Sequence, residues 1–281
     1  MNPDAQTALY AVLGTPIAHS LSPALHNAAF RAEKRNAVYV ACDVGEAGLA
    51  EALRGLFVLG AKGANLTAPL KTRALALADE VSPLARRAGA INTLKFEGGR
   101  VIGHNTDGEG FVRFVQRAGV PLEGAHVAFL GAGGAVRGLA VSLRTAKVAS
   151  MTAVVRWRAT RMPIEGVEFA QDPATAEAAV RAATIVVQAT PLGAKESDAL
   201  PAPAEWLGGS AVAIDLRYDP AATPWLTAVR ARGVRGANGL GMLIEQALLS
   251  QELWHRTMPP RSALEEAVAW SDPFSPGRPG S

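Results

Sequence analysis

Two short segments of this 281-residue chain carry side chains suited to chemistry. The first, NLTAPLK from Asn65 to Lys71, places a lysine beside amide and hydroxyl groups, directly after a short apolar run. The second, FLGAGGAVR, places glycines between an apolar run and an amphipathic stretch. An ammonium group among polar neighbours suits protonation of a polar substrate, and a glycine-rich turn suits a phosphate. The chain therefore predicts a substrate site followed by a nucleotide site.

The glycine-rich segment has the context of a dinucleotide-binding loop, because it follows the apolar run at 126–130 and opens a helical pattern. Gly131 would allow a tight turn, and Gly133 would let the backbone approach a pyrophosphate held at the helix N-terminus. The strict GxGxxG pattern fails at its third glycine, where Val136 stands. A plain strand-to-helix turn is therefore the alternative.

The residues after the next expected strand indicate which dinucleotide this loop takes. NAD sites usually place a carboxylate there for the ribose hydroxyl, whereas NADP sites place arginine near the 2′-phosphate. The stretch 124–164 contains no carboxylate, and Arg156, Arg158 and Arg161 fall within it. The pattern favours NADP over NAD. The alternative for each arginine is a solvated loop residue.

Composition is typical of a compact soluble globule, with 49% hydrophobic and 19% charged residues. The net charge is only +3, without a run of more than two basic residues, which argues against nucleic-acid binding. The N-terminus lacks a signal-peptide pattern, and no apolar run approaches the about 20 residues that span a bilayer. We therefore expect a cytoplasmic protein without membrane contact. The single Cys42 is expected to be a small buried hydrophobe, and the histidine spacing predicts no metal site.

Short apolar runs alternate with amphipathic stretches, which predicts an α/β fold with βαβ units and parallel sheets. Strands are expected at 9–13, 37–41, 61–65, 92–96, 100–103, 126–130, 151–155, 185–188 and 211–216. Helices are expected at 22–32, 47–59, 70–78, 106–118 and 239–255. Pro69 suits a first helical turn. Lys71 is thus expected near a helix start at the carboxyl end of a strand, where open α/β sheets bind ligands.

Six segments, in their order and spacing, resemble the shikimate dehydrogenase family: GTPIAHSLSPALHNAAF, NLTAPLK, GAINTL, GHNTDGEG, GAGGAVR and GLGMLIEQA. The resemblance covers about residues 8 to 255. It implies an α/β substrate domain at 1–108, a Rossmann-type NADP domain at 109–237, and helices at 238–268 that return to the first domain. The site would lie in a cleft between the two domains. Residues 269–281, rich in Pro, Gly and Ser, are expected to be disordered.

The resemblance also implies an activity and a role for each matching residue. The activity would be the NADP-dependent interconversion of 3-dehydroshikimate and shikimate by a monomer or homodimer. Lys71 and Asp107 would be the catalytic pair, with Lys71 supplying the proton. The substrate would contact Ser20, Ser22, Asn65, Thr67, Asn92, Tyr218 and Gln246. The cofactor would contact Gly131, Ala132, Gly133, Gly134, Ala135, Arg156, Arg158, Arg161, Thr190 and Gly239.

Each of these residues also has a simpler interpretation. Taken singly, Ser22 and Asp107 could be helix N-caps and Lys71 a surface lysine, although their joint occurrence in order outweighs these alternatives. Two other functions stay open. One is a quinate/shikimate dehydrogenase of broader substrate or NAD use, although the family associates Ser22 with shikimate. The other is a nucleotide-binding regulator without catalysis.

The run Arg156-Trp157-Arg158 generates the first testable prediction. Replacing both arginines with alanine removes two positive charges from the segment where NADP sites contact the 2′-phosphate. We expect the affinity for NADP to fall more than the affinity for NAD, as measured by titration of each cofactor. Equal losses for both cofactors would contradict this assignment.

Overall fold

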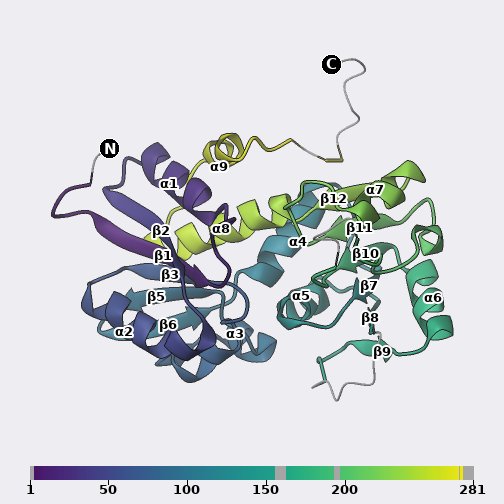
Figure 1. Cartoon of the computed structure of the whole chain (residues 1–281), viewed down its shortest axis with the longest axis horizontal. Helices are drawn as coiled ribbons and strands as arrows, with labels where there is room; N and C mark the ends of the chain where they lie inside the picture. The colour runs from purple at the N-terminus through teal and green to yellow at the C-terminus, as the bar shows by residue number, and fades with distance from the viewer. Residues whose placement is uncertain (1–2, 156–162, 193–196, 272, 275–281) are drawn as a thin grey trace. The chain divides into compact units, whose positions relative to one another are not determined.

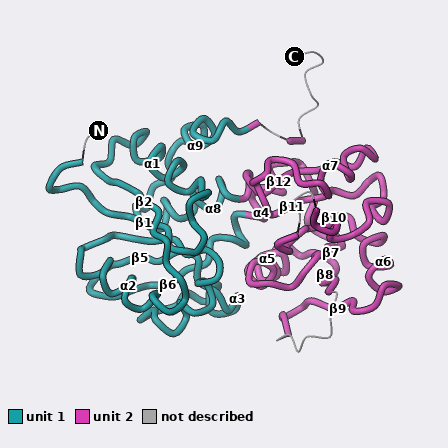
Figure 2. Tube along the Cα trace, in the orientation of Figure 1, with its two compact units in different colours: residues 1–110, 243–270 teal, residues 111–242, 271–281 magenta. Residues whose placement is uncertain are grey.

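Figure 1 shows the computed structural model, which describes residues 3–155, 163–192, 197–271 and 273–274. The chain forms two compact units, coloured separately in Figure 2. Unit 1 comprises residues 1–110 and 243–270, and unit 2 comprises residues 111–242 and 271–281. Both units combine helices with a sheet that contains parallel strands, so the predicted α/β fold class is confirmed.

The sheet of unit 1 is mixed, and its described strands lie in the order β2-β1-β3-β5-β6-β4. The strands are β1 (Ala8–Gly14), β2 (Ala37–Asp43), β3 (Gly63–Leu66), β4 (Glu80–Val81), β5 (Thr93–Glu97) and β6 (Arg100–His104). β5 runs antiparallel to both β3 and β6, so Thr93 pairs with Asn65 on one side and with His104 on the other. The residues after β3, before β5 and after β6 are thereby brought to one edge of the sheet.

Helices cover both faces of this sheet (Figure 1). The helices with residues in unit 1 are α1 (Ser22–Ala32), α2 (Leu49–Val58), α3 (Pro83–Ala88), the start of α4 (Asp107–Arg117), most of α8 (Leu240–His255), and α9 (Arg261–Ala267). One apolar cluster joins α2 to the sheet, and a second contains Tyr10, Phe30, Tyr39 and Trp254. Trp254 of α8 lies so close to Gly63 that no Cβ would fit there. Its indole N–H donates to the Leu94 carbonyl at 2.9 Å, which ties α8 to the sheet.

The sheet of unit 2 is parallel throughout its described strands, in the order β9-β8-β7-β10-β11-β12. The strands are β7 (His126–Leu130), β8 (Ser150–Val154), β9 (Glu168–Ala170), β10 (Ile185–Gln188), β11 (Val212–Asp215) and β12 (Arg235–Asn238). The helices that lie wholly in unit 2 are α5 (Gly134–Thr145), α6 (Pro173–Ala182) and α7 (Pro224–Ala231). This is the Rossmann strand order, in which two halves meet between the first and fourth strands of the sheet, here β7 and β10.

The helix expected at 70–78 is wrong. Only a single 3-10 turn forms there, at Arg73–Ala76. The Lys71 carbonyl accepts a hydrogen bond from the Ile91 N–H, and the Leu75 N–H bonds to Thr72 three residues back. Single hydrogen bonds of α-helical spacing form from Ala74 to Leu70 and from Ala78 to Ala74, but the carbonyl engaged by a distant segment and the i+3 bonds between them interrupt a continuous α-helical ladder. Lys71 therefore lies in a turn anchored to the segment before β5.

The remaining expected strands and helices occur within about two residues of their predicted bounds. The sequence pattern predicts no strand at β4, β9 or β12, which contain two, three and four residues. β4 and β9 are too short to show alternation of apolar and polar residues, and β12, with the sequence RGAN, contains no apolar run.

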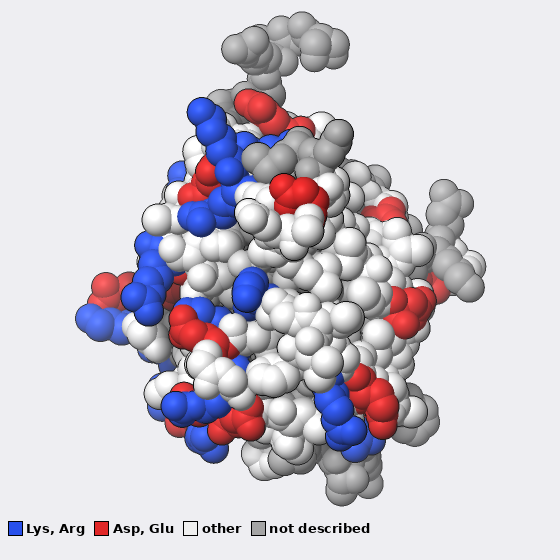
Figure 3. Space-filling model, turned by 90° about the vertical axis from the view of Figure 1, so that its left-hand side faces the viewer, with Lys and Arg blue, Asp and Glu red and all other residues white. Residues whose placement is uncertain are grey.

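Basic side chains lie beside acidic ones on the face drawn in Figure 3. In unit 1, for example, Arg73 Nε is 2.8 Å from Glu46 Oε2. Within the described ranges, no helix is both long and apolar enough to cross a bilayer. Of the tail expected to be disordered, residues 272 and 275–281 lie outside the described residues, and the ring of Phe274 stacks on Phe114 with centroids 6.1 Å apart.

Candidate functional site

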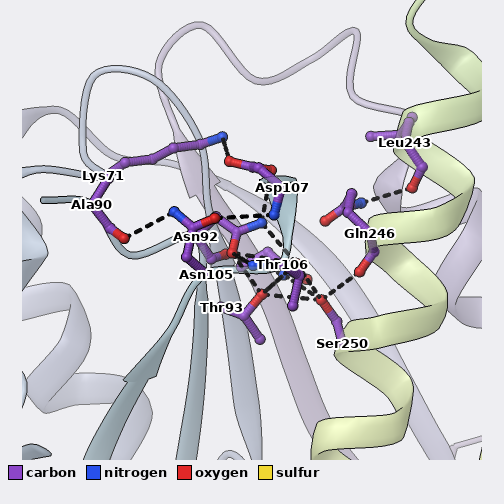
Figure 4. Close-up of polar contacts among 11 residues, drawn as sticks. Lys71, Ala90, Asn92, Thr93, Asn105, Thr106, Asp107, Leu243, Gln246 and Ser250 are labelled. Carbon is purple, nitrogen blue, oxygen red and sulfur yellow. Dashed lines mark hydrogen bonds and ion pairs between the residues drawn. The ribbon is translucent and has the colours of Figure 1, made fainter. Parts of the chain in front are cut away.

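Lys71 and Asp107 form an ion pair at the polar edge of the unit 1 sheet (Figure 4). Lys71 lies in the turn after β3, and Asp107 is the first residue of α4. Lys71 Nζ is 2.7 Å from Asp107 Oδ2, and the two side chains are 23% and 8% exposed. An aspartate is almost never this buried unless it is paired, whereas Lys71 is only partly buried. The pair keeps an ammonium group fixed in place, where it can exchange a proton with a small polar molecule.

Asn92 holds the second oxygen of the Asp107 carboxylate. Its Nδ2 donates to Asp107 Oδ1 at 2.8 Å and to Thr106 Oγ1 at 2.9 Å, and its Oδ1 accepts from the Thr106 N–H at 2.7 Å. Asn105 adds a further restraint, because its Oδ1 accepts from the Asp107 N–H and its Nδ2 donates to the Ala90 carbonyl. The carboxylate is thus fixed by Lys71 on one oxygen and by Asn92 on the other.

Asn65 is also buried, at 6% exposure, and its amide is bonded at both ends. Its Oδ1 accepts from the Tyr39 hydroxyl at 2.8 Å. Its Nδ2 donates to Thr93 Oγ1 at 3.0 Å, Ser250 Oγ at 3.1 Å and the Asn92 carbonyl at 3.2 Å. An amide oxygen has two lone pairs. Because Tyr39 uses one lone pair of Oδ1 and the protons of Nδ2 are already bonded, the second lone pair of Oδ1 can accept a hydrogen bond from a ligand.

The Tyr39 phenol that holds Asn65 stays protonated. Burial raises the pKa of Tyr39 well above its ordinary value, with a smaller rise from Cys42, while a hydrogen bond with Ser22 opposes the shift. The His26 ring stacks on Tyr39 with centroids 4.3 Å apart, and burial, followed by the charge of His255, lowers the pKa of His26 to about 3. The ring is therefore neutral, and its Nδ1 lies 2.8 Å from Gln251 Nε2.

Ser20 and Ser22 lie at the start of α1 and are linked to each other, because Ser20 Oγ accepts from the Ser22 N–H at 3.3 Å. The N-cap of α1 is Leu21, and no side chain caps this helix, so the N-cap alternative for Ser22 is wrong. Thr67 follows β3, and its methyl group fills the space where a Cβ of Gly14 would stand. One hydroxyl just before α1, one at its first residue and one after β3 can bind the polar groups of a ligand.

Gln246 reaches unit 1 on α8 (Figure 4). Its Nε2 donates to the Leu243 carbonyl at 2.8 Å. A Cβ on Gly110 would lie 2.8 Å from the Gln246 backbone nitrogen, so only glycine in α4 allows α8 to approach this closely. Unit 1 therefore contains Lys71, Asp107, Ser20, Ser22, Asn65, Thr67, Asn92 and Gln246 from the predicted substrate and catalytic set.

The glycine loop of unit 2 runs from the end of β7 into α5. Gly131 has a φ of +107°, and a Cβ there would lie 2.8 Å from the Thr190 methyl group. Gly133 is the N-cap of α5 and makes no side-chain cap bond, while Gly134 is its first residue. The loop continues through Ala132 and Ala135 without an acidic residue in the first helical turn. Uncapped backbone N–H groups at a helix N-terminus bind phosphate, so this loop fits a dinucleotide pyrophosphate.

Thr190 lies beside this loop because it follows β10, the strand next to β7. Gln188 Oε1 accepts from both the backbone N–H and the hydroxyl of Thr190, at 2.8 and 2.9 Å. Gly239 follows β12, and its closeness to the Leu216 carbonyl leaves no room for a Cβ. Tyr218 also lies in unit 2 and is partly exposed. Arg156, Arg158 and Arg161 lie outside the described residues.

Arg217 and Asn238 make further polar contacts with backbone segments of unit 2. The Arg217 guanidinium donates to the Asp219 carbonyl at 3.1 Å and to the Pro191 carbonyl at 3.4 Å. Asn238 accepts from the Leu240 N–H at 3.1 Å at the start of α8. Both residues therefore join backbone segments next to the carboxyl ends of β10, β11 and β12. Among the described residues, no group of three His, Cys, Asp or Glu could hold a metal ion.

Four residues that hydrogen-bond to Asn65 or Asn92 were not predicted from the sequence: Tyr39, Thr93, Thr106 and Ser250. Thr93 and Thr106 stand inside recognised segments, directly beside Asn92 and Asp107, so their positions offered a signal. Tyr39 and Ser250 lie within an apolar strand and an amphipathic helix, where nothing in the pattern distinguishes them.

The fold and the site define a class of α/β proteins that join a Rossmann dinucleotide-binding unit to a second α/β unit with a polar site. Comparison with known proteins narrows this class. The family profile of the shikimate dehydrogenase substrate binding domain matches residues 12–94. The chain is 39% identical over 272 residues to shikimate dehydrogenase (NADP(+)) of Symbiobacterium thermophilum, covering 92% of each chain. The chain belongs to the shikimate dehydrogenase family.

Two solved structures illustrate the likeness of the fold. Shikimate 5-dehydrogenase of Thermus thermophilus, in complex with NADP(H) and shikimate, matches with a TM-score of 0.83 and 35% identity, covering 94% of this chain and 99% of that one. Shikimate 5-dehydrogenase of Listeria monocytogenes, in complex with shikimate and NAD, matches with a TM-score of 0.84 and 27% identity, covering 95% and 98%.

The glycine loop generates a second testable prediction. A Cβ on Gly133 would meet no atom of the described residues within 4 Å, and its φ is −82°, so Gly133→Ala fits the fold. The methyl group would, however, stand where a pyrophosphate approaches the backbone. We expect the unfolding midpoint to stay unchanged while the affinity for a reduced nicotinamide dinucleotide falls about tenfold or more, in a fluorescence titration.

Gly209→Ala is the matched control, because a Cβ on this glycine would also meet none of the described atoms within 4 Å, and the residue lies away from the loop, before β11. It should change neither quantity. Unaltered cofactor affinity in Gly133→Ala would remove this loop from the binding site.

Proposed function

We propose that this chain catalyses the NADP-dependent reversible reduction of 3-dehydroshikimate to shikimate, a step of aromatic amino-acid biosynthesis. The observation that carries the proposal is the ion pair of Lys71 and Asp107, held at the sheet edge among hydroxyl and amide side chains. Membership of the shikimate dehydrogenase family and the names of its relatives support the substrate and the cofactor.

Lys71 is the proton donor for reduction and the acceptor for oxidation. Its ammonium group has three N–H donors, of which one bonds to Asp107. The others have no partner among the described residues, so they are available to a substrate oxygen. A positive charge held there stabilises the negative charge that develops on this oxygen as the carbonyl is reduced.

Asp107 orients this ammonium group and is in turn oriented by Asn92. The hydroxyls of Ser20 and Ser22 bind the substrate carboxylate, because neutral O–H donors hold an anion without placing a further charge in the site. Asn65 and Thr67 bind ring hydroxyls. Gln246 and Tyr218 complete the polar contacts proposed for the substrate.

The residues of unit 2 fit NADP. The backbone of Gly131 to Ala135 provides the pyrophosphate site at the uncapped start of α5, and Gly239 allows close approach of the nicotinamide end. Thr190 adds a hydroxyl beside the loop. When bound, NADP supplies the hydride acceptor or donor for the substrate carbon.

Broader substrate or NAD use is the first alternative, and the NAD complex of the Listeria monocytogenes relative favours testing it. The decisive experiment measures kcat/KM at 340 nm for shikimate and for quinate, each with NADP and with NAD. We expect shikimate with NADP to give the highest value. Higher values for quinate or NAD would establish the alternative, and no turnover with any pair would indicate a non-catalytic nucleotide-binding regulator.

Lys71→Ala tests the mechanism. Because the ammonium group acts mainly in the transition state, we expect kcat to fall about a hundredfold or more while KM for shikimate changes modestly. Lys62→Ala, which removes an exposed lysine just before β3, is the matched control and should retain the wild-type kcat. A near-normal kcat in Lys71→Ala would remove this lysine from the mechanism.

A further inference from the structure

Ser250 lies on α8 and belongs to a polar layer that it forms with Asn65, Thr93, Thr106 and the Gln246 carbonyl (Figure 4). It is fully buried, at 0% exposure. Its Oγ is 2.9 Å from the Gln246 carbonyl, 3.1 Å from Asn65 Nδ2 and 3.0 Å from Thr93 Oγ1. A longer contact of 3.4 Å reaches Thr106 Oγ1.

The direction of these bonds follows from the number of protons available. A serine hydroxyl has one proton and two lone pairs. The Gln246 carbonyl can only accept, so it takes the Ser250 proton. At its contacts with Asn65 and Thr93, Ser250 can then act only as an acceptor.

This requirement fixes which end of the Asn65 amide faces α8. An acceptor at Ser250 selects the amide nitrogen, and the Tyr39 hydroxyl, a donor, selects the amide oxygen at the opposite end. A flipped amide would place its oxygen against the lone pairs of Ser250. The Asn92 carbonyl, 3.2 Å from Nδ2, can also only accept, so Ser250 and this carbonyl at one end and Tyr39 at the other impose one orientation on Asn65.

We infer that Ser250 is a positioning residue for substrate binding: its hydroxyl, directed by the Gln246 carbonyl, locks the Asn65 amide so that Oδ1 is the atom offered to a substrate hydroxyl. The inference rests on the proposed function, in which Asn65 contacts the substrate ring. Ser250 itself does not touch the reacting atoms.

A second buried helical serine shows that burial alone does not require such contacts. Ser142 of α5 is 4% exposed, and its hydroxyl has no hydrogen-bond partner among the described residues. The substitutions Ser250→Ala and Ser142→Ala remove the same atom from two buried helical sites. Only the first removes a link to the polar layer.

The test compares steady-state constants of these two variants with those of the wild type. Loss of one neutral hydrogen bond should raise KM for shikimate about fivefold in Ser250→Ala. The kcat and the KM for NADP should stay within about twofold, because Asn65 is proposed to bind the ground and transition states alike. Ser142→Ala should leave all three constants within about twofold.

An Asn65→Ala background separates positioning from a general structural effect. With the amide gone, adding Ser250→Ala should cause no further rise in KM, since the two changes act through one group. An unchanged KM in Ser250→Ala, or the same fold-rise with and without Asn65, would overturn the inference. If Ser250→Ala does not fold, Ser250→Cys, with a side chain of similar shape and a weak sulfur acceptor, takes its place.

An NMR measurement that does not depend on catalysis distinguishes this inference from the proposed function. The side-chain NH₂ signals of Asn65 in a ¹⁵N-correlated NMR spectrum should shift in Ser250→Ala and stay in place in Ser142→Ala. Unchanged chemical shifts of the Asn65 NH₂ group in both variants would refute the positioning of Asn65 by Ser250. A wild-type protein that fails to oxidise shikimate would refute the proposed function. The NMR comparison of Ser250→Ala with Ser142→Ala could still be made.

Discussion

The buried carboxylate of Asp107 is the constraint on which the rest of unit 1 depends. A charge taken out of water is costly unless each of its oxygens has a partner. Lys71 supplies the partner for one oxygen and Asn92 for the other. These three residues come from three segments of the chain. The mixed sheet, with β5 running against both neighbours, brings those segments to one edge.

Around this pair, the polar side chains leave little freedom for rearrangement. Asn92 and Asn65 each use both ends of their amides on neighbours within unit 1. A buried network in which both ends of each amide are bonded is rigid, because rotation of an amide would place a donor against a donor or an acceptor against an acceptor. A ligand at this edge therefore meets groups that already point in one direction, and little conformational entropy is lost on binding.

The sequence predicted most of the fold, because the long amphipathic stretches form helices and the apolar runs form strands in the structure. It failed at 70–78, where the pattern contains no sign that the Lys71 carbonyl bonds to Ile91. For the site, ordered motifs located Lys71, Asn92 and Asp107, whose places in the fold agree with one polar edge. Tyr39 and Ser250 could not be predicted, because their roles depend on tertiary contacts between elements and local periodicity carries no information about such contacts.

The placement of Trp254 and Ser250 has a consequence for how the chain is made. Unit 2 contains one continuous segment, 111–242, that holds all of its described strands, whereas unit 1 needs residues 243–270 in addition to 1–110. A ribosome releases the N-terminal part of unit 1 first, yet that part lacks the helix whose indole covers Gly63. Domains generally fold as units during synthesis. The nucleotide-binding unit can therefore complete its core while the earlier-made part of unit 1 still lacks α8 and α9.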